Sequence, residues 1–367
     1  MKALLVTPPL ISASGWGRYS LSVIEKLKLK KDIELVIKSD SQELLPLTSL
    51  FSFIYNLLEI RRTTKNVDIV HAFDGWPYGV YGYVGVLGTR KKLFITAVGT
   101  YSVAPLQSLI KGFLLRLAYK RAQMVFCISN YTKNRIIEKV KVKRISTVYM
   151  GNKSIDDLPP DVINVYKEKY NLNNRYPILL TTGAIKYRKG QLDVVRAINL
   201  LKKEYPSILY IMAGQTTNAS YFNNILSFVK GENIENNIRV IDNAKDDLVI
   251  RALYELCDIF ILTSNNGKNG HFEGFGLVLL EAAGAGKPVI GSRDCGIEDA
   301  LEDGYNGYLV EQGNPIDIKE KIKKVLSNDI IDFRENSKEF AGRFSWDKTV
   351  NLYVKYYEGR EILNKNN

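Results

Sequence analysis

Short apolar runs alternate with longer amphipathic segments along the first part of the chain. After the first run, Leu21, Ile24 and Leu27 recur every third residue, which is the spacing of one face of a helix. Apolar strands with helices between them are typical of a parallel sheet that is covered on both faces. The runs that we interpret as strands cover residues 3–7, 33–38, 68–73, 92–98, 124–129 and 145–149.

The same alternation starts again in the second part of the chain, which predicts a second Rossmann-like domain. The polar stretch 152–174, with Pro159-Pro160 inside it, is the expected linker. We therefore expect an α/β fold with an N-terminal domain at 1–165 and a C-terminal domain at 166–344. The predicted strands of the second domain cover residues 178–182, 208–213, 238–241, 259–263 and 288–292, and its predicted helices cover 192–204, 221–230, 247–256 and 276–286.

The end of the chain, residues 345–367, is the third element of the prediction. The segment from Ser345 to Leu363 has the amphipathic pattern of one long helix, with Trp346, Tyr353 and Tyr357 among its aromatic residues. We expect this helix to cross back and pack on the N-terminal domain. Two facing domains of this type bind ligands beside the carboxyl ends of their strands.

Composition agrees with a two-domain globular protein. The chain has 367 residues, of which 46% are hydrophobic and 25% are charged. No apolar stretch approaches the roughly 20 residues of a transmembrane helix. The run after Met1 ends at Pro8-Pro9, which is too early for a signal peptide. We expect a protein that works in the cytoplasm.

Cysteine and histidine are too few and too scattered for a metal site. The three cysteines are Cys127, Cys257 and Cys295, and the two histidines are His71 and His271. None of the cysteines forms a CxxC pair, so neither a zinc site nor a disulfide framework is expected. We interpret the cysteines as small buried apolar residues.

The positive charge of the chain lies entirely in its first part. Residues 1–165 hold 24 lysines and arginines against 12 aspartates and glutamates, whereas residues 166–367 hold 27 of each kind, so the net charge of +12 belongs to the first part. Such an excess fits a polyanionic partner, namely anionic lipid, a phosphorylated acceptor or nucleic acid, and it equally fits lysines that are simply solvated. No nucleic-acid-binding motif accompanies it, so we do not expect a nucleic-acid partner.

The segment Leu106–Gln123 is apolar with basic residues at intervals. This pattern is typical of a helix that lies at a membrane interface. A helix that packs on the core between two strands would look similar, and both interpretations stay open. The first one predicts that the protein associates with the cytoplasmic face of a membrane.

The most specific motif runs from Glu273 to Ala282. Glu273-Gly-Phe-Gly follows a predicted strand and a polar loop, and it opens a helix whose only other charge is Glu281. The two glycines let the backbone approach a ligand closely, and the amides at the start of a helix attract a pyrophosphate. A carboxylate at position 281 on an apolar helix needs a hydrogen-bonding partner, and ribose hydroxyls are suitable partners.

Two further loops follow predicted strands. The first, Thr182–Gly190, contains Lys186, Arg188 and Lys189, which together form a plausible phosphate clamp. The second, Ser14–Tyr19, contains Gly15 and Gly17, and this isolated GxG is a weak signal for a phosphate or acceptor site.

The motif at Glu273–Ala282 resembles the signature of the retaining GT-B glycosyltransferases of family 4, the glycosyl transferases group 1. That signature has two glutamates separated by seven residues. The resemblance implies that Glu273 faces the donor sugar, that Glu281 binds the ribose, and that the amides at 275–278 hold the sugar and the diphosphate. It extends to order and spacing over most of the chain, including Tyr149-Met-Gly and Ile211-Met-Ala-Gly.

The loop Thr182–Gly190 resembles the family's Gly-Arg…Lys-Gly loop, in which the cations neutralise the donor diphosphate. Lys189 matches the family's lysine, but Ala184 stands where the arginine is expected. We expect Lys186 or Arg188 to supply the missing charge. The loop Ser14–Tyr19 likewise resembles the family's Gly-Gly-x-Gly-Arg-Tyr loop, with Ser14 in place of the first glycine.

Val98 is the main departure from the family pattern. In the family a histidine that faces the donor sugar usually precedes Gly-Thr, whereas this chain has Val98-Gly99-Thr100. A valine neither donates a hydrogen bond nor moves a proton. Either other groups near the sugar contribute, or the protein is a weak or inactive relative that binds sugar nucleotides or glycans. The candidates on the acceptor side are His71, Asp74, Tyr101 and Ser129.

The resemblance implies a hexosyl transfer from a nucleoside diphosphate sugar to the hydroxyl of a glycan, a glycolipid or a lipid-linked saccharide, with retention of configuration. A UDP-sugar is the expected donor, with GDP- and ADP-sugars as alternatives, and neither a cofactor nor a metal is required. The expected catalytic residues are Glu273, Lys189 and Arg188. The expected donor-binding residues are Gly15, Gly17, Lys186, Lys189, Gly274, Phe275, Gly276, Leu277, Val278 and Glu281.

Overall fold

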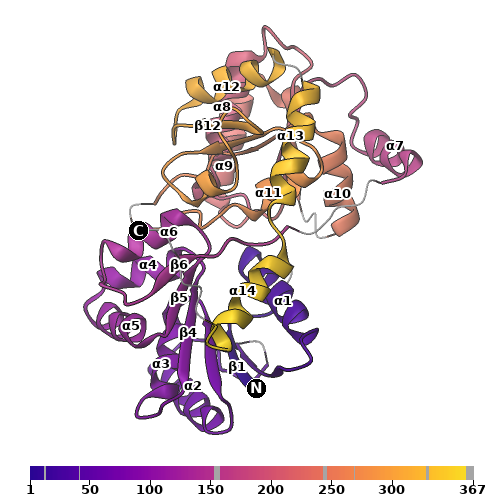
Figure 1. Ribbon diagram of the computed structural model, residues 1–367. Helices are drawn as coiled ribbons and strands as arrows, with labels where there is room; N and C mark the ends of the chain where they lie inside the picture. Colours follow the sequence, from indigo (N-terminus) through magenta and orange to yellow (C-terminus); the bar gives the residue numbers. More distant parts are fainter. Residues whose placement is uncertain are drawn as a thin grey trace. The chain divides into compact units, whose positions relative to one another are not determined.

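The computed structural model describes residues 1–11, 14–40, 42–152, 158–242, 246–267, 269–327 and 330–360 (Figure 1). Its contacts divide the chain into two compact units. The first unit contains residues 1–151 together with those from Phe344 onward, and the second contains residues 152–343.

The first unit is built on a parallel sheet of six strands in the order β2-β1-β3-β4-β5-β6. Side chains on both faces of β3 and β5 are buried, which explains why these strands are continuous apolar runs. The strands are β1 (Lys2–Thr7), β2 (Glu34–Ser39), β3 (Ile69–Phe73), β4 (Lys92–Ala97), β5 (Met124–Cys127) and β6 (Ile145–Thr147). The helices are α1 (Gly15–Lys28), α2 (Leu50–Thr64), α3 (Val80–Val86), α4 (Thr100–Val103), α5 (Leu109–Arg121), α6 (Asn130–Ile137) and α14 (Trp346–Tyr357).

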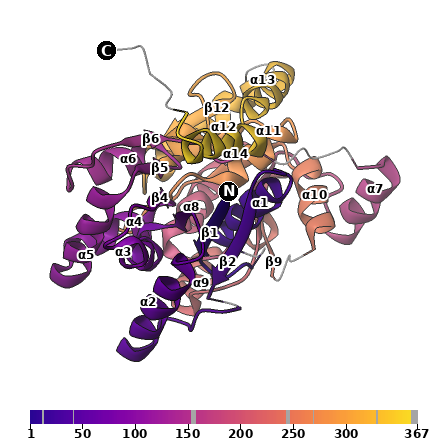
Figure 2. The same ribbon diagram turned by 60° about the horizontal axis from the view of Figure 1, so that its bottom comes forward.

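Helix α14 returns from the end of the chain to the first sheet, as the sequence predicts, and it lies beside α1 in both ribbon views (Figures 1 and 2). Its Tyr353 is fully buried, and the hydroxyls of Tyr353 and Tyr19 lie 2.9 Å apart. The hydroxyl of Tyr357 contacts Nδ1 of His71 on β3. Lys26 of α1 forms an ion pair with Asp347 at 2.9 Å. The last helix is therefore part of the core of the first unit.

The second unit repeats the architecture with the strand order β12-β11-β10-β7-β8-β9, all parallel. Side chains of α8, α9 and α12 fill a large apolar core together with those of the strands. The strands are β7 (Ile178–Thr182), β8 (Leu209–Ala213), β9 (Ile238–Ile241), β10 (Ile259–Leu262), β11 (Val289–Ser292) and β12 (Gly307–Val310). The helices are α7 (Pro160–Lys169), α8 (Gln191–Leu201), α9 (Ala219–Gly231), α10 (Asp247–Leu256), α11 (Leu277–Gly284), α12 (Pro315–Ser327) and α13 (Ile330–Gly342).

The structure differs from the sequence prediction at several elements, among them β12, α7 and α14. The second sheet has a sixth strand, β12, which the apolar pattern did not reveal because the strand is short and follows the glycine-rich turn at Gly304. The expected linker contains helix α7, which begins at Pro160, and proline is well tolerated in a first helical turn. Helix α14 ends at Tyr357, and Leu363 lies outside the described residues.

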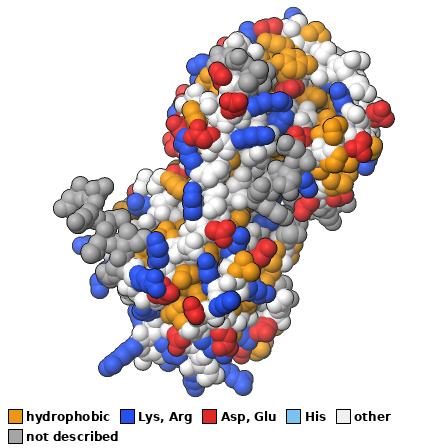
Figure 3. All heavy atoms as spheres, turned by 45° about the vertical axis from the view of Figure 1, so that its right-hand side comes forward, with side chains coloured by type: hydrophobic (Ala, Val, Ile, Leu, Met, Phe, Trp, Pro, Cys, Tyr) orange, Lys and Arg blue, Asp and Glu red, His pale blue; other side chains and the backbone are white. Residues whose placement is uncertain are grey.

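The charge of the first unit is not gathered into one patch on the face shown in Figure 3. Lysine and arginine side chains are scattered there among acidic and apolar ones. Within the described ranges, no helix combines the length and the apolar character needed to cross a bilayer.

The burial of Tyr353 predicts a large loss of stability in Tyr353→Ala. Removing a fully buried aromatic side chain costs about 3–5 kcal/mol, and this one also bonds to Tyr19. All three tryptophans of the chain, Trp16, Trp76 and Trp346, lie in the first unit, so urea unfolding followed by tryptophan fluorescence reports on this unit. Lys355→Ala, an exposed change on the same helix, is the matched control. Equal midpoints for the two variants would contradict the packing role of α14.

Candidate active site

The order of the second sheet reverses between β7 and β10, which are neighbours although two strands separate them in sequence. In open parallel sheets, the loops that leave two such strands diverge and form a ligand-binding crevice at the carboxyl ends. The loop after β7 carries Lys186, Arg188 and Lys189, and the segment after β10 carries Glu273. The fold therefore brings together the two motifs that the sequence singled out.

Glu273 accepts hydrogen bonds from two cations through the same oxygen. Its Oε2 lies 2.6 Å from Nη1 of Arg188 and 2.7 Å from Nζ of Lys189. The side chains of Glu273 and Lys189 are each 13% exposed. The hydroxyl of Ser264 lies 3.4 Å from the same carboxylate oxygen. These contacts tie the loop after β7 to the loop after β10.

The backbone of the first loop is held close to the second. Gly190 adopts a left-handed conformation with φ 69° and caps α8. A Cβ atom at this position would lie 1.9 Å from the carbonyl oxygen of Thr263, so a side chain does not fit here. The amide of Asn265 donates to the carbonyl of Arg188 at 2.8 Å. The positions of Arg188 and Lys189 thus depend on main-chain contacts as well as on Glu273.

Electrostatics makes the cluster a site for an anion. Burial alone would raise the pKa of Glu273, but the charges of Arg188 and Lys189 and the hydrogen bond from Lys189 outweigh it and hold this pKa at about 2. Burial, Arg188 and Lys189 lower the pKa of Lys186, because they disfavour its charged form. An anionic ligand would relieve that repulsion. With Glu273 ionised, three cations face one carboxylate, and the positive excess matches a diphosphate in sign.

Helix α11 follows Glu273 and begins after Gly276, which has the left-handed φ of 87°. Leu277 and Val278 are its first residues, and amides in the first turn of a helix have no partner within the helix. Glu281 is half-buried, and its Oε2 accepts a hydrogen bond of 2.9 Å from the hydroxyl of Tyr254. Tyr254 is therefore a hydrogen-bonding partner of Glu281 that could not be identified from the sequence.

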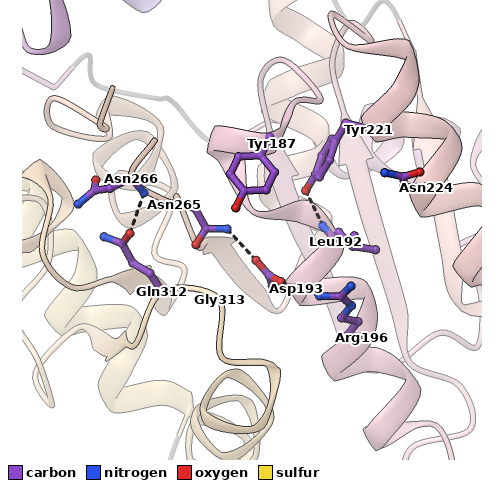
Figure 4. A pocket seen from close by; sticks show the side chains of 10 residues that line it. All are labelled: Tyr187, Leu192, Asp193, Arg196, Tyr221, Asn224, Asn265, Asn266, Gln312 and Gly313. Carbon is purple, nitrogen blue, oxygen red and sulfur yellow. Dashed lines mark hydrogen bonds and ion pairs between the residues drawn. The ribbon is translucent and has the colours of Figure 1, made fainter. Parts of the chain in front are cut away.

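A cavity of about 430 Å³ lies in the second unit, and its lining includes Tyr187 of the loop after β7 and Asn265 of the loop after β10 (Figure 4). Residues that line the cavity form hydrogen bonds with each other. Asn265 donates to Asp193 at 2.8 Å, and the amide of Asn266 donates to Gln312 at 2.7 Å. Asp193 and Asn265, which brace the loop that holds Arg188, were not predicted from the sequence. An acidic residue in the first turn of α8 and the polar run after β10 were the only available signals. The residues that line the cavity are Tyr187, Leu192, Asp193, Arg196, Tyr221, Asn224, Asn265, Asn266, Gln312 and Gly313.

In the loop after β1, Gly17 lies against the backbone of its own loop. A Cβ atom at Gly17 would lie 2.0 Å from the carbonyl oxygen of Ile11, so the close approach that Gly17 allows is to its own loop. The amide of Gly17 donates to the side chain of Ser14, which caps α1. Gly15 is exposed. Gly17 therefore has a local structural reason, whereas a Cβ atom at Gly15 would meet nothing within 4 Å.

Two of the four residues expected on the acceptor side lie in the core. His71 is fully buried between Tyr357 and Thr96, whose hydroxyl lies 2.8 Å from Nε2, and burial lowers the pKa of His71 to about 3. Ser129 is also fully buried and caps α6 by accepting from the amide of Thr132. Both side chains are enclosed by their own domain, and neither presents an exposed surface in this structure.

The other two lie at the carboxyl edge of the first sheet. Asp74 has a left-handed φ of 103°, and its buried carboxyl accepts from the amide of Gly75 at 2.7 Å and from the hydroxyl of Ser102. Burial raises its pKa to about 7. Tyr101 is 46% exposed and stacks on Trp16 with ring centroids 5.1 Å apart. Val98, at the end of β4, is half-buried. Tyr101 alone of the four candidates presents a largely exposed side chain.

The buried carboxyl of Asp74 predicts how stability changes with pH. In the folded protein it keeps its proton up to about pH 7, whereas an unfolded aspartate loses it at about pH 4. The folded state binds more protons between these values, so stability falls as the pH rises through this window. We expect the Tm of Asp74→Asn, followed by tryptophan fluorescence, to fall less than that of the wild type from about pH 5 to about pH 8. Parallel Tm profiles would show that Asp74 is ionised when folded.

Comparison with known families matches both domains. Residues 162–344 match the family described as Glycosyl transferases group 1, and residues 30–151 match Glycosyltransferase Family 4. The first match contains the ion-pair cluster and both glutamates of the motif. The second covers most of the first sheet.

Individual proteins give the same result. An uncharacterized glycosyltransferase of Methanocaldococcus jannaschii is 29% identical over 93% of this chain and 94% of its own length. The N-acetyl-alpha-D-glucosaminyl L-malate synthase of Bacillus anthracis is 28% identical over 80% of this chain and 75% of its own length.

Solved structures share the fold. A glycosyltransferase of Rickettsia africae superposes with a TM-score of 0.80 at 23% identity, covering 100% of this chain and 99% of its own. Anabaena HepE in complex with UDP and glucose superposes with a TM-score of 0.80 at 18% identity, covering 98% of this chain and 100% of its own. The chain therefore belongs to the GT-B glycosyltransferases.

Proposed function

We propose that the protein transfers a hexosyl unit from a UDP-sugar to a hydroxyl group of a glycan, a glycolipid or a lipid-linked saccharide, with retention at the anomeric carbon. The observation that carries the proposal is the cluster of Arg188, Lys189 and Glu273 at the point where the strand order reverses. HepE, which shares the fold, was solved with UDP and glucose, and this supports a UDP-sugar as donor. The motif resemblance supports retention.

In this proposal the second domain binds the donor. Lys189, with Arg188 and Lys186, neutralises the diphosphate, and the amides at the start of α11 contribute hydrogen bonds to it. Glu281 binds the ribose while Tyr254 orients its carboxylate. Glu273 lies before the helix and faces the sugar, and its low pKa keeps it an acceptor of hydrogen bonds at neutral pH.

The chemical step is a substitution at the anomeric carbon. The bond from that carbon to the diphosphate oxygen breaks, a bond from the acceptor oxygen forms, and the proton of the acceptor hydroxyl passes to the leaving phosphate. Charge develops on the leaving diphosphate in the transition state, so fixed cations lower the barrier. Lys189 and Arg188 are held in place by Glu273 and by main-chain contacts, which limits reorganisation during the reaction.

A second candidate function is the binding of a sugar nucleotide or a glycan with weak transfer or none. Val98 and Ala184 favour it. Val98 places an apolar side chain at the end of β4, and Ala184 provides no cation in the loop after β7. A protein that binds a sugar nucleotide without transfer differs from the enzyme in turnover and not in donor binding, so turnover and binding need separate measurements.

The proposed contacts of Lys189 with the diphosphate predict how the protein binds UDP. We expect UDP to raise the Tm of the wild type, by mass action on the folded state, and Lys189→Ala to weaken UDP binding about 10–100-fold, as for a charged hydrogen bond. Uridine, which has no phosphate, should bind both proteins equally. Lys230→Ala, an exposed lysine change in the same domain, is the control. Unchanged UDP affinity in Lys189→Ala, measured by calorimetry, would contradict the clamp.

The ribose contact predicts a different pattern. Glu281→Ala should weaken the binding of both UDP and uridine about tenfold or more, since a charged hydrogen bond to the ribose is lost. Tyr254→Phe removes only the hydroxyl that orients Glu281 and should have a smaller effect. Equal affinities for wild type and Glu281→Ala would show that the ribose lies elsewhere. A panel that adds GDP and ADP distinguishes the three donor classes.

Turnover and stereochemistry are tested with the donor that binds. Incubation with UDP-sugar and candidate acceptors should release UDP and give a product whose anomeric configuration, read by NMR, equals that of the donor. An inverted product would overturn the proposed retention. Donor binding with neither transfer nor hydrolysis would favour the binding protein over the enzyme.

A further inference from the structure

The first sheet ends at an outer strand, β2, that is long for its position. Strand β2 has six residues, whereas the outer strand at the other side of this sheet, β6, has three. The outer strands of the second sheet, β9 and β12, have four residues each. Short outer strands are one means by which proteins avoid pairing with another chain. Among the described strands, β2 therefore offers the longest edge for such pairing.

The second sheet shows which position beside β2 is vacant. Strand β8 pairs with β7, and β9 then covers the outer side of β8. Strand β2 pairs with β1 in the same way, but the next strand, β3, lies on the opposite side of β1. In the part of the chain that the structure describes, no strand takes the place that β9 has in the second sheet. The common doubly wound order has a strand at this position.

Main-chain groups of β2 face this vacant position. The amide of Glu34 donates to the carbonyl of Met1 at 2.9 Å, so the main chain of Glu34 faces β1. Successive residues of a strand direct these groups to opposite sides, so those of Leu35 and Ile37 face away from β1. Between described residues, no hydrogen bond reaches them from the outer side. Two amides and two carbonyls are thus available to another strand.

A groove runs along the same edge. A cavity of about 430 Å³ is lined by four consecutive residues of β2, Leu35–Lys38, and by residues of α2 that include Glu59 and Arg62. The side chains of Leu35, Val36 and Ile37 are only half-buried. The groove therefore has room for side chains of an added strand.

The sequence of β2 is complementary to itself when it is reversed. It reads Glu34-Leu-Val-Ile-Lys38. If β2 of a second copy lies antiparallel, with Val36 opposite Val36, then Leu35 lies opposite Ile37 and Glu34 opposite Lys38. The Leu35–Ile37 positions become the hydrogen-bonded pairs, which agrees with the outward direction of their main-chain groups. The Glu34–Lys38 positions become non-hydrogen-bonded pairs, in which side chains lie closest and opposite charges are favourable.

The surrounding charges fit the same register. Glu34 forms an ion pair with Lys2, and Lys38 forms one with Glu59 at 2.8 Å and another with Glu43. In the antiparallel arrangement, Glu34 lies between Lys2 of its own chain and Lys38 of the second copy. Charges of alternating sign then cross the contact. Two β2 strands that met in parallel and in register would instead place Glu34 beside Glu34, which is unfavourable.

We propose that two copies of this chain pair through their β2 strands, antiparallel, about a two-fold axis at Val36. The pairing joins two six-stranded sheets into one, and it closes because each copy uses its β2 edge once. It goes beyond the proposed function, since it needs neither donor nor acceptor. A contact built around one strand pair is small, so we expect association to depend on protein concentration in the micromolar range.

A cysteine at the axis tests the register. In Val36→Cys the two opposing Cα atoms would lie about 4.5 Å apart, which a disulfide can span. Mild oxidation of the full-length variant should give a covalent dimer that a reductant reverses, and the native cysteines are buried and should not react. Leu35→Cys, an equally half-buried position on the same strand, is the matched control and should stay monomeric, because Leu35 lies opposite Ile37. Equal cross-linking of both variants, or of neither, would overturn the proposal.

Sedimentation velocity measures the association without a cross-link. The mass of the wild type should rise from one chain to two as concentration increases. Glu34→Lys should weaken this association about tenfold or more, because two opposite-charge pairs become like-charge pairs. Glu168→Lys makes the same change of net charge at an exposed position of α7 and should associate as the wild type does. The Tm of each variant shows that it is folded.

The remaining outcomes would each contradict the proposal. Equal association of folded Glu34→Lys and the wild type would place the dimer contact on another surface. A wild type that stays monomeric at all concentrations would leave the β2 edge to a different chain. UDP binding, measured on the same preparations, tests the donor site independently. Folded Glu34→Lys that is monomeric and binds UDP normally would support the β2 contact, whatever the outcome for transfer.

Discussion

A single carboxylate oxygen joins the two loops on which the proposed donor site depends. Oε2 of Glu273 accepts from both Arg188 and Lys189, and these residues come from segments that follow different strands. A carboxylate removed from water is unfavourable unless it is paired, so neither cation is free to move away while Glu273 is enclosed. The ion pair thus fixes the position of one loop against the other. It keeps cations that would otherwise repel each other at one end of the sheet, where we propose that the donor diphosphate binds.

Much of this site was predictable from the sequence, because it consists of local motifs placed by topology. A strand followed by a basic loop and a strand followed by Glu-Gly-Phe-Gly are each visible in the chain, and the reversal of strand order brings them together. The contacts that brace the loops were not predictable. Asp193 and Asn265 are far apart in sequence, and nothing in the composition of either segment shows that their side chains meet. Tyr254 holds Glu281 through a similar long-range contact.

In the first domain, the contacts of individual side chains were harder still to predict from the sequence. His71 occupies a strand of a type that often ends at a binding site, but its partner is Tyr357, almost at the other end of the chain. The sequence predicted that α14 returns to the first sheet, but it did not show that α14 would cover His71. Gly17 is a second case, since a glycine that permits close approach does not reveal which group approaches. For His71 the contact comes from a distant segment, whereas for Gly17 it comes from Ile11 of the same loop, and neither contact is visible in the sequence.

The two domains stabilise carboxyl groups near the edge of a sheet in different ways. In the second domain the charged groups are paired, and the pKa of Glu273 is lowered by its cations. In the first, the pKa of Asp74 is raised by burial, and its carboxyl is held by an amide and a hydroxyl. The large exposed apolar residues of α2 and α5 lie on the same domain. In the proposed function, the paired charges of the second domain bind a water-soluble nucleotide, and the acceptor is left to the first domain. The division of physical character between the domains thus follows the division between the proposed substrates.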